Sequence, residues 1–305
     1  MPCRDLENNK QLIIYVWVII LIFYIHYILI QNQRMNILLS HIQSYLLSSN
    51  MHYRIHKGTG VPVLFLHGWG GSTKSFEYIE SKFIAMGHTV VNLDLWGFGQ
   101  SNLPPQNYGI FDYANDISNL LDNLGYKEYY LIGHSFGGRI AILLGNNPKV
   151  SKIILVNSAG VKPKRSLGYY YKVYSYKLKK NIKKIMNPQQ NKTKQTTGQI
   201  NKNANLGKRT ISKVGSQDYQ NLSDDFKAVF VRVVNTHLHK QIKAITASTL
   251  IIWGSKDKDT PLYMAKFLHK NIANSGLIVF ETAGHYSYVD HYDEFITIAN
   301  KFLFL

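Results

Sequence analysis

The stretch Tyr129–Leu144, which reads YYLIGHSFGGRIAILL, decides the fold. Its first four residues are aromatic or aliphatic, as in a buried strand, and its last six continue in a helical pattern. Between them lies GHSFGG, in which a sharp strand-to-helix turn would hold a serine hydroxyl clear of the sheet. A Cβ at Gly133 or Gly137 would collide with the neighbouring chain at such a turn. The stretch therefore marks Ser135 as a candidate nucleophile.

A nucleophilic serine needs an imidazole that removes its proton and a carboxylate that orients the imidazole. The strand-like run Thr249–Gly254 is followed after three residues by Asp257, and Leu277–Glu281 is followed by a Gly-His pair ending at His285. We therefore predict Asp257 as the acid and His285 as the base. Asp259 competes with Asp257, which is favoured because it lies nearer the strand end.

Acyl transfer at a serine also needs hydrogen-bond donors for the developing oxyanion. The loop His67–Gly71 reads HGWGG and leaves the strand-like run Val61–Leu66. A loop so rich in glycine directs backbone N–H groups at a ligand. We predict the N–H of Trp69, with that of Gly70 behind it, and the N–H of Phe136 as the donors.

The remaining histidines in these motifs receive structural interpretations. We expect the His67 imidazole to pack inside its loop, and the His134 side chain to point away from the serine beside it. His237 and His239 are two residues apart, a poor spacing for chelation from a helix. The sequence therefore predicts no metal, and no cofactor is implied.

Strand-like runs alternate with amphipathic helix patterns along the chain. The strand-like runs are His52–Ile55, Val61–Leu66, Thr89–Leu93, Tyr129–Ile132, Ile153–Val156, Leu250–Trp253 and Ile278–Phe280. The helix patterns are Lys74–Met86, Asp112–Leu124, Arg139–Gly145, Tyr263–Asn274 and Tyr288–Phe302, and Phe226–Val234 also looks helical. This alternation predicts one doubly wound, mostly parallel α/β sheet with the motif-bearing loops at the carboxyl ends of its strands.

From Met51 to Leu305 the chain resembles the α/β-hydrolase fold superfamily, interrupted only by a lid. The matching pieces are HGWGG, GHSFGG, WGSKD at 253–257 and the Gly-His pair ending at His285, and a fifth, DLWGFGQS at 94–101, resembles a structural loop. The resemblance implies an esterase-like serine hydrolase in which Asp94 is structural. The strand-like run Lys152–Ser158 ends without a carboxylate, which removes the other usual position of the acid.

The resemblance leaves the substrate open, because this fold hosts esterases, lipases, C–C bond hydrolases, peroxidases and dehalogenases. A serine at position 135 argues against the dehalogenase and epoxide-hydrolase branches, which would require a carboxylate there.

Positive charge is concentrated in one segment. The formal net charge is +17, and residues 162–213 hold fifteen of the 35 Lys and Arg residues but none of the 18 Asp and Glu residues. We place a basic lid at 162–245, with a disordered, polar insertion at 187–213. Tyr169–Met186 reads as a basic amphipathic helix that covers the active site or binds an anionic membrane surface, two compatible roles. No nucleic acid is expected, since no recognition motif accompanies the charge.

The N-terminal segment 1–34 contains nineteen mostly apolar residues, Leu12–Ile30, enough to span a bilayer. They predict a signal anchor whose orientation the flanking charges leave undetermined. The alternative is a translation start at Met35, which would give a cytoplasmic enzyme with an amphipathic lead-in at 35–50. The chain has one cysteine, which excludes an intramolecular disulfide.

The predicted function is hydrolysis of an ester or similarly activated acyl compound by a core of residues 51–161 and 246–305. Two alternatives stay open. A C–C bond hydrolase of dienoic keto acids would suit the positive charge of the lid. A non-catalytic, membrane-tethered binding scaffold is disfavoured because all three triad positions are filled.

Overall fold

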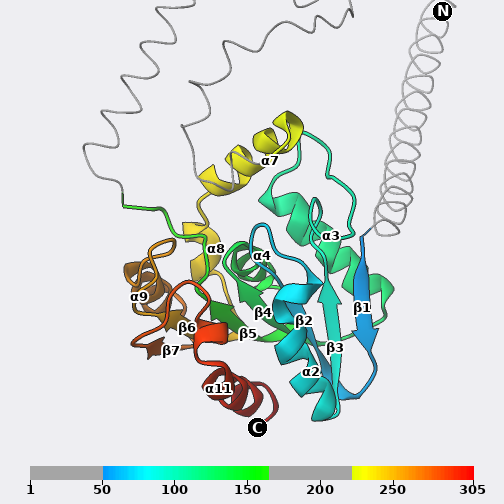
Figure 1. Ribbon diagram of the computed structural model, residues 1–305, viewed down its shortest axis with the longest axis vertical. Helices are drawn as coiled ribbons and strands as arrows, with labels where there is room; N and C mark the ends of the chain where they lie inside the picture. Colours follow the sequence, from blue (N-terminus) through cyan, green and yellow to red (C-terminus); the bar gives the residue numbers. More distant parts are fainter. Residues whose placement is uncertain (1–50, 165–221) are drawn as a thin grey trace, which may run out of the picture.

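The structure is a computed structural model that describes residues 51–164 and 222–305 (Figure 1). The predicted anchor, the lead-in, the basic amphipathic helix and the polar insertion all lie outside the described residues and stay predictions. Within the two described ranges, no helix combines the length and the apolar character that crossing a membrane requires.

Seven strands form one sheet in the order β1-β3-β2-β4-β5-β6-β7. They are β1 (Tyr53–His56), β2 (Thr59–Leu66), β3 (His88–Leu93), β4 (Tyr129–His134), β5 (Val150–Val156), β6 (Ser248–Gly254) and β7 (Ser275–Phe280). Among the strands of the described ranges, only the pairing of β1 with β3 is antiparallel. The predicted, mostly parallel sheet is therefore confirmed, with all seven strands near their expected places.

Helices cover both faces of this sheet (Figure 1). They are the 3₁₀ turn η1 (Thr73–Phe76) and the α-helices α2 (Glu77–Ala85), α3 (Ile110–Asn123), α4 (Phe136–Leu144), α7 (Asp224–Asn235), α8 (His239–Lys243), α9 (Tyr263–Asn271), α10 (Ser287–Asp290) and α11 (Tyr292–Phe304). The predicted helix at 74–86 begins with a 3₁₀ turn, and the one at 288–302 is divided in two. It is divided because His291 leaves the helical region, with φ −125° and ψ 57°.

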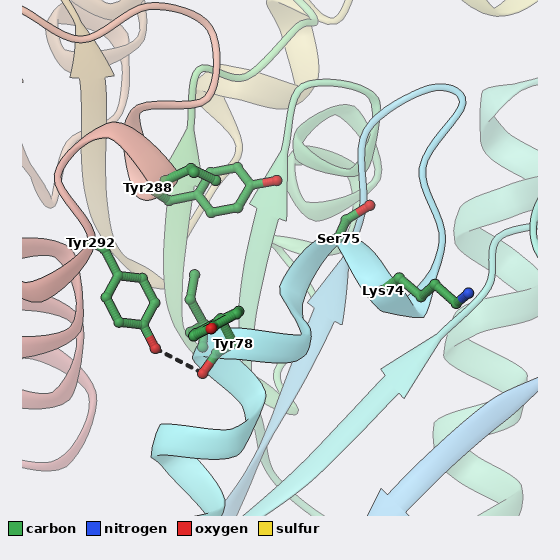
Figure 2. Close-up of a pocket in the computed structure, with 7 residues that line it drawn as sticks. Lys74, Ser75, Tyr78, Tyr288 and Tyr292 are labelled. Carbon is green, nitrogen blue, oxygen red and sulfur yellow. Dashed lines mark hydrogen bonds between the residues drawn. The ribbon is translucent and has the colours of Figure 1, made fainter.

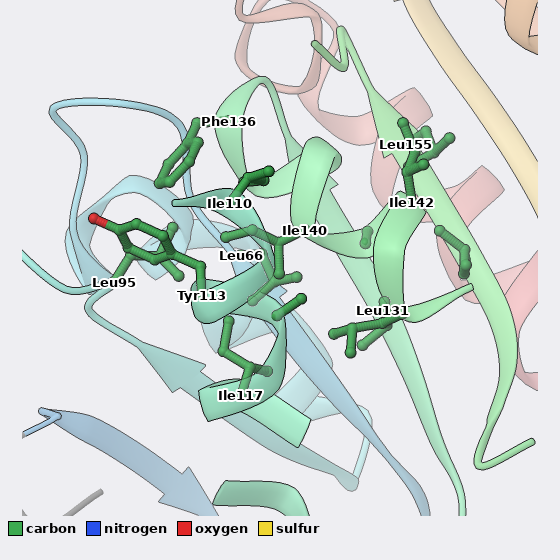
Figure 3. Packing of buried hydrophobic residues seen from close by; sticks show 14 of the residues in the cluster. Leu66, Leu95, Ile110, Tyr113, Ile117, Leu131, Phe136, Ile140, Ile142 and Leu155 are labelled. Carbon is green, nitrogen blue, oxygen red and sulfur yellow. The ribbon is translucent and has the colours of Figure 1, made fainter. Parts of the chain in front are cut away.

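Alternate residues of the central strands feed two separate apolar clusters. Leu64 and Leu66 of β2 pack with α3, α4, α8 and α9 on one face, part of which Figure 3 shows. Val63 and Phe65 pack with α2 and α11 on the other face. Side chains alternate across a strand, so this division is what a sheet buried on both faces requires.

The parallel strands end at one edge, and all four sequence motifs leave from that edge. Leu66 at the end of β2 pairs with Gly133 in β4, and His134 pairs with Val156 at the end of β5. Val156 in turn pairs with Ile252 in β6. The loops after β2, β4, β5, β6 and β7 are therefore neighbours in space, although more than two hundred residues separate the end of β2 from the end of β7.

Candidate active site

The turn between β4 and α4 holds Ser135 in a backbone conformation that side-chain-bearing residues rarely adopt. Its φ is 50° and its ψ is −107°. A Cβ on Gly133 would lie 2.7 Å from the Gly137 carbonyl oxygen, and one on Gly137 would overlap the Leu66 carbonyl. Both glycines are thus required by close backbone approach, as the sequence predicts. The strained, half-buried serine stands at the edge where the strands end.

Two backbone N–H groups near Ser135 are unpaired. Phe136 is the first residue of α4, where an N–H has no partner within the helix. Among the described residues, neither its N–H nor that of Trp69 makes a hydrogen bond. The loop that carries Trp69 is held against the β4–α4 turn around Ser135, the serine elbow, since the Gly137 N–H donates to the His67 carbonyl over 3.0 Å. Both groups are free to donate to a ligand.

Asp257 and His285 come together across the loops after β6 and β7. Nδ1 of His285 lies 2.9 Å from Oδ2 of Asp257, and the side chains are 14% and 0% exposed. Burial alone raises the pKa of Asp257, but hydrogen bonds from His285, Thr260 and Asn157 outweigh it and lower the pKa to about 2. Asp257 is therefore a carboxylate at neutral pH, and it receives an N–H from the imidazole.

Asp259 occupies a different place from its competitor. Its side chain is exposed, while its backbone N–H donates to Oδ1 of Asp257 over 2.8 Å. Oxygens of the two carboxylates and a His285 nitrogen lie within 4.8 Å of one another, close enough to hold a metal ion. However, Asp257 already accepts hydrogen bonds on both oxygens, which suits an oriented hydrogen-bond acceptor better than a metal ligand.

His67 packs inside its loop. Its Nε2 accepts the Leu95 N–H over 2.9 Å, so the proton must sit on Nδ1, which faces the Gly68 carbonyl at 2.8 Å. Burial lowers the pKa of His67 to about 4, and the ring is neutral.

His134 is also buried, but it touches the candidate base. Its Nε2 lies 2.9 Å from the carbonyl oxygen of His285, and the two ring centroids are 4.8 Å apart. Burial, with a smaller contribution from His285, lowers the pKa of His134 to about 3. A neutral His134 therefore donates to the backbone of the loop that carries His285, a contact absent from the sequence analysis.

Aromatic side chains surround Trp69. Its ring stacks on Phe226 of α7 at 5.2 Å and meets Phe230, Phe98 and Phe136 edge-on at 4.8 to 5.1 Å. The helix α7, expected at 226–234, thus lies over the loop that carries one candidate oxyanion donor. The basic amphipathic helix predicted to cover the active site, Tyr169–Met186, lies outside the described residues.

Arg139 attaches α7 to the elbow helix. Its guanidinium donates to the carbonyl oxygens of Val233, Val234 and Thr236 at the end of α7, over 2.6 to 3.3 Å. Burial lowers the pKa of Arg139 to about 10, so the side chain is still charged at neutral pH. Its positive charge lies at the C-terminal end of α7, where the helix dipole is negative.

Two polar partners of Asp257 are not marked by any sequence motif. Thr260 donates its Oγ1 hydrogen within the same loop, and Asn157 donates from the end of β5. Their residue types were visible at strand ends, but their partner lies 100 positions away from Asn157 and only the sheet brings the two together.

A pocket of about 290 Å³ opens between the η1–α2 segment and the α10–α11 pair (Figure 2). Tyr78, Tyr288 and Tyr292 line much of it, and the Tyr292 hydroxyl donates to the Tyr78 carbonyl over 2.9 Å. None of the five predicted site residues lines this pocket.

The chain is similar to known proteins over most of its length. It is 28% identical to the AB hydrolase superfamily protein YisY of Bacillus subtilis, over 80% of this chain and 92% of that protein. It is 27% identical to a pimeloyl-[acyl-carrier protein] methyl ester esterase of Legionella pneumophila, over 83% and 99%. The solved esterase from Exiguobacterium antarcticum superposes with a TM-score of 0.60 at 24% identity, over 82% and 94%.

The profile of one family, described as alpha/beta hydrolase fold, matches residues 61–292. That range contains the serine elbow, the glycine-rich loop and the Asp257–His285 pair. The chain belongs to the α/β-hydrolase fold family.

Proposed function

We propose that this protein is a serine hydrolase that cleaves an ester or a similarly activated acyl compound through an acyl-enzyme intermediate. The observation that carries the proposal is the 2.9 Å contact between Nδ1 of His285 and the buried carboxylate of Asp257, at the edge where Ser135 stands. That contact leaves Nε2 of His285 without a hydrogen-bond partner among the described residues, so it is available to accept a proton from a serine.

In the first half of the reaction, the Ser135 oxygen attacks the acyl carbon and its proton passes to Nε2 of His285. His285 then gives this proton to the leaving oxygen, which departs as an alcohol. Asp257 remains ionised and stabilises the imidazolium through Nδ1–H. Water repeats the sequence on the acyl-enzyme and releases the acid.

The N–H groups of Trp69 and Phe136 stabilise the oxyanion in this proposal. Their freedom from internal hydrogen bonds supports the role, as does the positive end of α4 beneath the turn. Each donor is worth about 3 kcal/mol in such sites, so losing one slows turnover roughly a hundredfold.

The aromatic side chains around Trp69 support an apolar acyl group as substrate. One relative is named as a methyl ester esterase, which supports the ester class without specifying the acyl chain. A panel of acyl esters of increasing chain length, assayed beside a dienoic keto acid, separates esterase activity from C–C bond hydrolysis. Faster turnover of the keto acid would favour the second reaction.

The test is covalent labelling of the purified full-length protein with a fluorophosphonate probe, which reacts only with an activated serine. We expect labelling of the wild type and loss of labelling in Ser135→Ala and His285→Ala. Asp257→Asn should also lose most labelling, because it no longer holds the required imidazole tautomer. Asp259→Asn, a matched change in the exposed neighbour, should label as the wild type does.

Two results would overturn the proposal. A folded wild-type protein that does not label would favour the non-catalytic binding scaffold. Strong labelling of Ser135→Ala would place the reactive group on another residue. Thermal unfolding of each variant shows whether a loss of labelling reflects a loss of fold.

A further inference from the structure

Asn157 follows β5 directly and is fully buried among three of the loops at the active edge. Its Nδ2 donates to Oδ2 of Asp257 over 2.6 Å and also lies 3.2 Å from the Gly284 carbonyl, next to His285. Its backbone carbonyl oxygen lies 3.0 Å from the Thr260 hydroxyl, whose hydrogen goes to the nearer Asp257 carboxylate. One side chain thus contacts the loop of the candidate acid and the loop of the candidate base.

The orientation of this amide follows from chemistry. A carboxylate only accepts hydrogen bonds, so the NH₂ end must face Asp257. The carbonyl end then faces Ser287 of α10, whose hydroxyl lies 2.5 Å from Oδ1 of Asn157 and therefore donates to it. Ser287 is buried too, and its hydroxyl holds the oxygen end of the amide in place.

The backbone explains why an asparagine can occupy this place. Asn157 has a φ of 43°, one of two positive φ values outside glycine among the described residues, the other belonging to Ser135. Asparagine and glycine tolerate this region better than most residues do. A backbone requirement alone would therefore be met by glycine, which lacks the amide. This difference allows the turn and the amide to be tested separately.

We propose that Asn157, held at its amide oxygen by Ser287, is a positioning residue that keeps the Asp257 carboxylate in the direction from which it receives the His285 N–H. This inference rests on the proposed function and goes beyond it by adding two residues that never touch the substrate. Oδ2 of Asp257 has three neighbouring donors, from His285, Thr260 and Asn157. Of these, only Asn157 comes from outside the β6 and β7 loops, so it ties the pair to the centre of the sheet.

The titratable groups that face Asp257 are His285, which contacts it, and the neutral His134, which is within reach of its charge. The exposed Asp259 lies in the same loop. None of them is altered by a change at Asn157 or Ser287. A shift in pH dependence caused by such a change therefore reports on the Asp257–His285 pair.

The central experiment compares the wild type with Asn157→Gly, which keeps the backbone conformation and deletes the amide. The measured quantity is the rate constant of fluorophosphonate labelling of the full-length protein from pH 5 to pH 9. We expect labelling about tenfold slower or worse, the usual effect of losing a hydrogen bond to a charged group. The acid limb of the profile should move to higher pH, because the carboxylate loses a donor and the pair binds its proton more tightly.

Asn157→Asp tests the same point with the shape preserved. A second carboxylate beside Asp257 should move the acid limb further to higher pH than Asn157→Gly does, because two carboxylates so close share a proton. Ser287→Ala leaves every contact of Asp257 in place and removes the donor that holds the oxygen end of the amide. It should slow labelling in the same direction by a smaller factor, and it keeps the inference testable if Asn157→Gly does not fold.

Wild-type labelling rates and an unchanged pH profile in both Asn157→Gly and Ser287→Ala would overturn the inference, leaving Asn157 as a turn residue only. A lower melting temperature with an unchanged profile leads to the same conclusion. If the folded wild type does not label at all, the proposed function fails first and this inference fails with it.

Discussion

Two buried imidazoles make the stability of this fold depend on pH between 7 and 5. The pKa of His67 is about 4 and that of His134 about 3, both below the ordinary value of 6.5 because burial disfavours the charged ring. The folded state therefore binds fewer protons than the unfolded chain as the pH falls below 6.5. Stability that is complete above that value is lost progressively until each folded-state pKa is reached.

The size of the loss follows from the same values. At pH 5 each ring contributes about 2 kcal/mol less to the free energy of unfolding than at pH 7, so the two together account for about 4 kcal/mol. Below pH 4 the loss of unfolding free energy caused by His67 levels off at about 3 kcal/mol, while the loss caused by His134 continues to grow. A protein of ordinary stability would approach unfolding under these conditions.

The assay is urea unfolding of the full-length protein at pH 7, 6 and 5, with His67→Gln as the perturbation. The variant should be less stable at pH 7, because glutamine does not reproduce both hydrogen bonds of the ring. Between pH 7 and 5, however, it should lose about 2 kcal/mol less than the wild type loses. His269→Gln, at an exposed histidine, serves as the matched control and should follow the wild-type pH dependence. If the free energy of unfolding fell by the same amount between pH 7 and 5 in the wild type and in His67→Gln, His67 would be protonated without cost to the fold, and the reasoning would be refuted.

Three further predictions concern the elbow and the helix above it. Gly137→Ala should abolish soluble, folded protein or lower its melting temperature severely, since the new methyl would overlap the Leu66 carbonyl; a melting temperature within a few degrees of wild type would contradict the backbone contact. Arg139→Met should leave the carbonyls of Val233, Val234 and Thr236 without their donor, so amide hydrogen exchange should accelerate in residues 224–236 while the sheet stays protected; an equal change of exchange in α7 and the sheet would count against an anchoring role. Phe226→Ala should destabilise the fold by about 3 kcal/mol or more in urea unfolding, whereas the half-exposed Phe111→Ala should cost less than about 1 kcal/mol, and equal losses would show that α7 is not packed as described.

The core of the fold could be read from the sequence because its signals are local. The apolar run Tyr129–Ile132 before Ser135 and the glycines around the serine specify a strand and a tight turn, whatever the rest of the chain does. The same holds for β6 and β7, where a short apolar run precedes each candidate residue. Helix ends depend on contacts that a local pattern does not contain. The helix pattern at 288–302 is interrupted at His291, whose ring stacks on Phe280 of β7 at 4.7 Å, a tertiary contact.

What the sequence by itself determined was the family of folds, the order of the elements and three side chains of the right chemistry at strand ends. What only the tertiary structure decided was which of those groups meet. Asp257 and Asp259 are nearly equivalent in sequence, yet only the first is buried, with its Oδ2 against Nδ1 of His285. Asn157 and His134 acquire their partners solely because parallel strands bring their carboxyl ends to one edge. Residue type and local pattern are encoded over a few positions, whereas hydrogen-bond partners between loops depend on the packing of the whole sheet.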